Sequence, residues 1–156
     1  MRKDDDATEL QLSATDLANH LGCGHLTRLE QARAGGAINA PEWRDPKLDV
    51  LRERGLAHED AYLEFLRQSG VVIETVKESR QSLDAVGVVA TRELLAIGVP
   101  AIAQAPLVRG RWRGIADVLL RVEEPSDLGA WSYIAVDTKL AFETRGGSVL
   151  QLCLYS

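Results

Sequence analysis

The chain has 156 residues and a formal net charge of −5 at pH 7, with 46% hydrophobic and 26% charged residues. These values are typical of one soluble globular domain with its own core, and they argue against a strongly basic, histone-like DNA-binding protein. No apolar run approaches the roughly 20 residues of a membrane span, and the N-terminus lacks the apolar stretch of a secretory signal. We therefore expect a cytoplasmic protein that does not enter the membrane.

The first part of the chain is expected to be helical after a polar start. Residues 1–11 predict a flexible N-terminus. Ser13 is a candidate N-cap because Asp16 stands three residues further on, where the two can form a capping box. Two adjacent glycines predict the end of a second helix, and a loop with two prolines follows. The pattern therefore predicts helices over residues 13–21, 25–34 and 46–68.

The long helix carries a stripe of residues that recur at steps of three and four, which is typical of one helix face. The stripe includes His58, so we expect this side chain to point inward. A single histidine on such a face is more often a hydrogen-bonded core residue than a metal ligand, and both interpretations stay open. The stripe consists of Leu48, Leu51, Gly55, His58, Tyr62 and Phe65.

The second half of the chain predicts a sheet. A short strand is expected over 71–76 and a helix over 82–98. The apolar side of that helix is predicted to consist of Leu83, Val86, Ala90, Leu94 and Ile97. After Pro100 the apolar period changes from 3.6 to two. Arg109-Gly110 is a plausible hairpin turn, and Ser148 is a candidate N-cap for a last helix. The predicted strands are 101–108, 111–122 and 131–140, the last helix covers 148–156, and the fold class is mixed α/β.

Two carboxylates stand within these predicted strands. Asp117 lies in the apolar stretch GIADVLL, where an unpaired charge costs several kcal/mol. If its strand neighbours the strand that leads to Asp137, the two carboxylates converge and would need a divalent cation such as Mg²⁺ or Mn²⁺ between them. The simpler alternatives are that Asp117 pairs with Arg111 or Arg113, and that Asp137 forms an ordinary ion pair with Lys139.

Three more polar residues follow the second carboxylate. Lys139 shares a strand face with Asp137 and could stabilise negative charge on a phosphate. Gln151 and Tyr155 lie four residues apart, hence on one helix face, where they could hydrogen-bond a phosphate or orient the lysine. None of these three residues indicates a catalytic site by itself. The prediction depends on the whole set in its order along the chain: His58, Asp117, Asp137, Lys139, Gln151 and Tyr155.

The ordered motifs RGLAHE, GIAD, VDTK and QLCLY resemble the RecB-like branch of the PD-(D/E)XK nucleases over roughly residues 12–156. The sequence from RWRGIAD onward is also similar to RecB-family nucleases that form the N-terminal part of longer bacterial proteins, some of which are helicase fusions. The resemblance implies a restriction-endonuclease-like core with N-terminal helices, and Mg²⁺- or Mn²⁺-dependent hydrolysis of DNA in repair, recombination or defence. It implies His58, Asp117 and Asp137 as metal ligands, Lys139 as the catalytic lysine, and Gln151 and Tyr155 near the substrate. Glu59 is a weaker candidate for a supporting role.

The chain departs from this family in two ways. The family core has a further strand after the QxxxY helix, so we expect residues 12–156 to be a nuclease domain truncated at that point. Some relatives hold an iron–sulfur cluster, and Cys23 stands at the first cysteine position. The other three cysteines would lie beyond Ser156. DNA, and a helicase domain or protein, are the expected partners.

Two other functions stay open on the sequence. A truncated, non-catalytic module of the same fold could bind DNA or a protein, and the negative net charge favours it. A purely structural role in assembly is the third interpretation.

Overall fold

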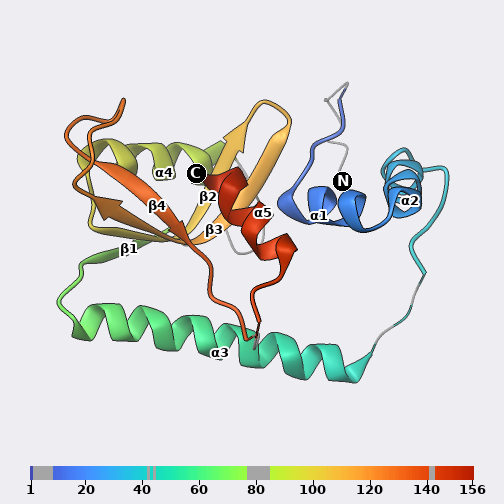
Figure 1. Ribbon diagram of the computed structural model, residues 1–156, viewed down its shortest axis with the longest axis horizontal. Helices are drawn as coiled ribbons and strands as arrows, with labels where there is room; N and C mark the ends of the chain where they lie inside the picture. The colour runs from blue at the N-terminus through green and yellow to red at the C-terminus, as the bar shows by residue number, and fades with distance from the viewer. Residues whose placement is uncertain (2–8, 42, 44, 77–84, 141–142) are drawn as a thin grey trace.

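In the computed structural model, which describes residues 1, 9–41, 43, 45–76, 85–140 and 143–156, five helices accompany one four-stranded sheet (Figure 1). The mixed α/β class expected from the sequence is confirmed. The helices are α1 (Ala14–Gly22), α2 (Gly24–Ala34), α3 (Pro46–Gln68), α4 (Ala85–Ile97) and α5 (Gly146–Tyr155); the strands are β1 (Ile73–Thr75), β2 (Ala101–Arg109), β3 (Trp112–Val122) and β4 (Ser132–Val136).

The strands follow one another across the sheet in the order β1-β2-β3-β4. β1 is parallel to β2, whereas β2, β3 and β4 are antiparallel neighbours. The β2–β3 hairpin closes at the Arg109–Trp112 pair, so its two-residue loop is Gly110-Arg111, one residue later than predicted. Gly110 has a φ of 58°, a conformation that glycine adopts at the first position of such loops.

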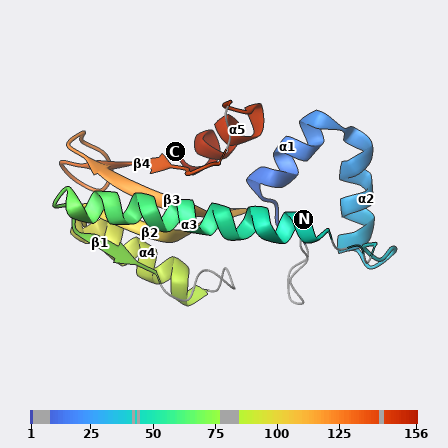
Figure 2. The same cartoon turned by 90° about the horizontal axis from the view of Figure 1, so that it is seen from below.

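Different helices cover the two faces of the sheet. Leu63 and Leu66 of α3 pack against Ala101, Ala103 and Val118, while Ala90, Leu94 and Leu95 of α4 pack with Ile102 and Leu119. Because neighbouring strand residues point to opposite faces, Ala101 and Ile102 belong to different layers. Figure 2 shows α4 and α5 on opposite sides of the sheet.

The N-terminal helix is tied to both the sheet and α5. Ser13 caps α1, and its backbone N–H donates to the Asp16 carboxylate, so the predicted capping box is confirmed. Just before it, the Leu12 backbone pairs with Arg111 and Arg113 at the start of β3. α1 then packs against α5. The first helix therefore supports the last one.

Helices α4 and α5 differ from the prediction in detail. The predicted apolar stripe of α4 included Val86 and Ile97, but both are exposed, and Gly87 and Thr91 are buried instead. α5 begins at Gly146 with Arg145 as N-cap, because the Ser148 and Val149 N–H groups donate to the Arg145 carbonyl. Ser148 is therefore not the cap.

Some predictions fall on residues outside the described ranges. These are most of the N-terminal segment 1–11, and the first three residues of the predicted helix 82–98. Within the described residues, no helix combines the length and apolar character needed to cross a membrane.

Candidate functional site

Asp117 in β3 and Asp137, directly after the end of β4, lie close together. Val118 of β3 pairs with Val136 of β4, which brings the residues beside them, Asp117 and Asp137, close enough for their carboxyl groups to affect one another. The Thr138 backbone N–H donates to Asp117 Oδ2 at 3.1 Å. β4 ends at Val136 rather than near residue 140 as predicted, and this diverted N–H is one reason: it bonds a side chain instead of a neighbouring strand.

The environment of Asp117 favours its protonated form. Burial raises the pKa of Asp117 from 3.8 to about 6; the hydrogen bond from Thr138 opposes the rise, and the neighbouring Asp137 adds to it. Two carboxylates at this separation repel one another when both are ionised. The positive charge of Lys139 offsets part of this repulsion, and a shared proton or a metal cation would offset more of it.

Asp137 is the best-connected residue of the site. Lys139 Nζ lies 2.7 Å from Asp137 Oδ1, and Gln151 Nε2 donates to the same oxygen at 3.2 Å. The Asp137 side chain is 5% exposed, while that of Lys139 is 47% exposed. The ordinary ion pair considered from the sequence does form. Its lysine, however, reaches solvent from a site with two carboxylates.

Tyr155 completes the group from the last turn of α5. Burial raises the pKa of its hydroxyl, as do the nearby Asp117 and Asp137, while a hydrogen bond with the Ile115 backbone opposes the rise. The ring lies directly against Gly114: a Cβ placed on that glycine would be 2.2 Å from the Tyr155 hydroxyl and 2.4 Å from Cε1. Only glycine at position 114 leaves room for this tyrosine.

We expect Gly114→Ala to lower the free energy of unfolding by about 1–3 kcal/mol, because the new methyl group must displace the tyrosine ring. Urea unfolding measures the loss, and near-UV circular dichroism reports the tyrosine. The matched control is Gly55→Ala in α3, where a Cβ meets nothing within 4 Å and alanine should add about 0.5–1 kcal/mol. In a Tyr155→Ala background the Gly114→Ala loss should vanish; an undiminished loss would contradict the steric account.

His58 does not join this group. The sequence predicted an inward-facing histidine, but His58 is exposed, and its stripe partners Leu48, Leu51 and Phe65 are exposed as well. The packed face of α3 is formed by Glu59, Leu63 and Leu66. α3 reaches the sheet only with its C-terminal half, since every residue from 46 to 58 except Gly55 is exposed. The prediction of the buried face was therefore wrong by one position.

Glu59 is the buried charged residue on the packed face of α3. It is 8% exposed and accepts a hydrogen bond from the Gln104 side chain. Gln104 stands in β2 between the pairs Ala103–Val118 and Ala105–Ala116, hence across from Asp117. Among the described residues, Gln104 is the only one other than glycine with a positive φ, which is 54°. This conformation is strained for a residue with a side chain, and such strain is common near functional sites.

Gln104 and Gly114 were not recognised from the sequence as parts of the site. For Gln104 a signal was present: like Asp117, it is a polar residue inside an apolar strand, AIAQAPLV. For Gly114 the sequence offers only its place in GIAD, because its steric role depends on where α5 packs.

Other candidate ligands are dispersed. Cys23 and Cys153 are free and exposed. Across the described ranges, no three His, Cys, Asp or Glu side chains gather closely enough to hold a metal ion. The group that does assemble consists of Asp117, Asp137, Lys139, Gln151 and Tyr155.

Comparison with known proteins adds no assignment: no protein-family model, no curated protein and no solved structure matches this chain.

Proposed function

We propose that this chain is a nuclease domain that hydrolyses DNA phosphodiester bonds with Mg²⁺ or Mn²⁺. The observation that carries the proposal is the pair of neighbouring carboxyl groups Asp117 and Asp137, flanked by Lys139. Two neighbouring carboxylates repel one another, and a bound cation would relieve that repulsion, while the ammonium group beside them suits a phosphate. The PD-(D/E)XK core is part of this proposal, supported by one carboxylate in β3 and a second directly after the antiparallel neighbour β4.

The residues present fit such a cation. Asp117 and Asp137 would hold it, since Mg²⁺ is commonly bound by one or two carboxylates together with waters and substrate phosphates. When bound, the cation would polarise the phosphodiester and lower the pKa of the attacking water. His58 is no part of this ligand set, because it lies exposed on α3.

The other side chains have separate roles in the proposal. Lys139 can leave Asp137 and meet the substrate phosphate, because its side chain is already half exposed. Gln151 fixes the Asp137 carboxylate through its amide N–H. The Tyr155 hydroxyl remains protonated at neutral pH, since its pKa is raised, and it can therefore donate a hydrogen bond to a phosphate oxygen.

The direct test is cleavage of labelled single- and double-stranded DNA by the purified chain, with Mg²⁺, with Mn²⁺ and with EDTA. Cleavage that requires the cation supports the proposal. A chain that cleaves equally in EDTA, or a chain that binds DNA without cleaving it under any of these conditions, would contradict it.

Lys139→Met should reduce the rate of cleavage by about a hundredfold, because it removes the positive charge that offsets charge developing on the phosphate. Since Lys139 is exposed, the fold should be preserved. Lys47→Met at the exposed start of α3 is the matched control and should cleave at the wild-type rate. Equal rates for the two variants would remove Lys139 from the mechanism.

The second candidate is a non-catalytic module that binds DNA or a protein. The net charge of −5 favours it, as does the fact that Lys139 already has a partner in Asp137. Calorimetric titration with Mn²⁺ distinguishes the two functions. Mn²⁺ binding that depends on Asp117 supports the nuclease, and the absence of such binding supports the non-catalytic module.

A further inference from the structure

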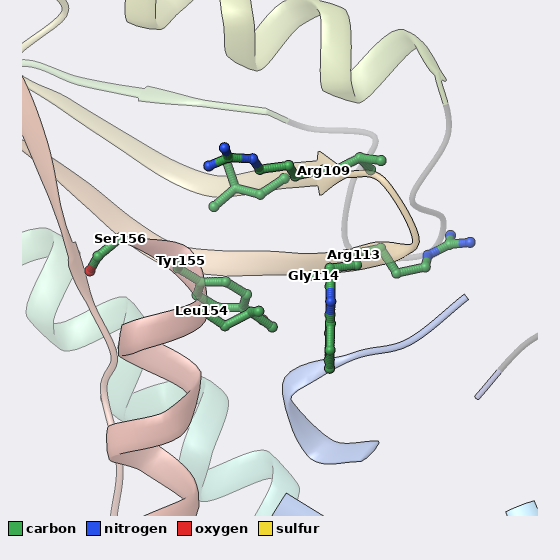
Figure 3. A pocket seen from close by; sticks show the side chains of 9 residues that line it. Arg109, Arg113, Gly114, Leu154, Tyr155 and Ser156 are labelled. Carbon is green, nitrogen blue, oxygen red and sulfur yellow. The ribbon is translucent and has the colours of Figure 1, made fainter. Parts of the chain in front are cut away.

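A cavity of about 200 Å³ lies between the end of the β2–β3 hairpin and the last turn of α5 (Figure 3). Arg109, Trp112 and Arg113 contribute to its hairpin wall, and Tyr155 to its helix wall. The cavity therefore combines the Arg109 guanidinium group with aromatic surface.

This cavity adjoins the carboxylate pair through a shared residue. Tyr155 lines it, and the same tyrosine lies close enough to Asp117 and Asp137 for both to affect its hydroxyl. Gly114, which makes room for that ring, also lines the cavity and stands three residues before Asp117 on β3. A ligand held at the carboxylates can extend past Tyr155 into the cavity.

The charge changes sign between the two places. The carboxylate pair is negative when ionised, whereas the hairpin end of the cavity is positive at Arg109. Arg109 is exposed, and no carboxylate of the described residues pairs with it. In Figure 3 the Arg109 side chain runs back along β2, while that of Arg113 points the other way. Arg109 is thus placed to meet an anion at the rim.

We propose that this cavity receives the nucleotide next to the scissile phosphate of a single DNA strand, with the Arg109 guanidinium on its phosphate and its base or sugar against Trp112 and Tyr155. The inference rests on the proposed nuclease function and adds the class of substrate. A guanidinium matches phosphate oxygens, and aromatic walls accept any base. A base pair is too large for a cavity of this size, so a single strand is favoured over a duplex.

The test compares Arg109→Gln with Arg92→Gln, an exposed arginine on α4, a helix that lies on the other side of the sheet from α5. Binding of a labelled single-stranded oligonucleotide is measured in EDTA from 50 to 200 mM salt. Arg109→Gln should weaken binding about fivefold and lower the slope of log K against log salt by about 0.7, the effect of one lost phosphate contact on a single strand. Arg92→Gln should match the wild type.

A second substrate separates this inference from the proposed function. Bis(4-nitrophenyl) phosphate has no neighbouring nucleotide, so its hydrolysis by the wild type tests the nuclease without involving the cavity. If Arg109→Gln binds the oligonucleotide like Arg92→Gln, or if duplex binding is weakened equally, the cavity proposal is overturned while hydrolysis of the small diester still supports the nuclease. If the wild type hydrolyses neither substrate, the nuclease proposal fails, and the binding comparison still decides the cavity.

Discussion

Asp137→Ala is expected to reduce DNA cleavage at least about a thousandfold, because it removes one of the two carboxylates that would hold the cation. The same change should abolish calorimetric binding of Mn²⁺. It deletes the acceptor of both Lys139 and Gln151, so the remaining groups lose their common anchor as well as the charge.

The fold should survive this change. Losing two polar contacts lowers the free energy of unfolding by about 1–2 kcal/mol. Removing the carboxylate next to Asp117 also removes a repulsion, which raises the free energy of unfolding. We therefore expect the free energy of unfolding to change by less than about 1 kcal/mol. Asp127→Ala, an exposed aspartate in the β3–β4 loop, is the matched control. Normal cleavage by Asp137→Ala would refute the proposed mechanism.

Asp117→Asn should also abolish cleavage while making the metal-free protein more stable at alkaline pH. The pKa of Asp117 is about 6 in the folded chain against an ordinary 3.8, so the folded state binds the proton more tightly than the unfolded state does. The stability contributed by this proton is complete below about pH 4, is lost as the pH rises to about 6, and is absent above that.

The size of this effect follows from the shift. Two pKa units correspond to about 3 kcal/mol, and partial solvent exposure reduces this to about 1–2 kcal/mol. Asparagine does not titrate, and it keeps an oxygen for the Thr138 N–H. The variant should therefore be about 1–2 kcal/mol more stable than the wild type at pH 8 and equal to it at pH 4. Urea unfolding in EDTA at both pH values measures this, and a less stable variant at pH 8 would contradict it.

The order and type of the elements could be predicted from the sequence because local signals determine them. The capping box at Ser13, the glycines after α2 and the change of apolar period after Pro100 all correspond to observed features. The convergence of Asp117 and Asp137 followed from one further step, that consecutive strands tend to be neighbours.

The faces of the helices could not be predicted in the same way. In α3 and α4 the periodic stripe chosen from the sequence lies next to the stripe that is buried, because both helices expose large apolar residues such as Phe65, Val86 and Ile97. Periodicity shows that a helix has an apolar side, but tertiary contacts decide which residues meet the sheet. The buried hydrogen bond between Glu59 and Gln104 is such a contact. Glu59 is buried on the packed face of α3, and its neighbour His58 is exposed.

The packing of α1 against α5 has a consequence for how this site forms during folding. A Cβ on Gly147 of α5 would touch Ala18 of α1, a contact between residues about 130 positions apart, and closing so long a loop is slow and entropically unfavourable. The β2–β3–β4 meander can form from nearby residues and place Asp117 beside Asp137 early. Gln151 and Tyr155 would be added later, when the first and last helices dock, so the carboxylate pair would exist for a time without the side chains that orient it.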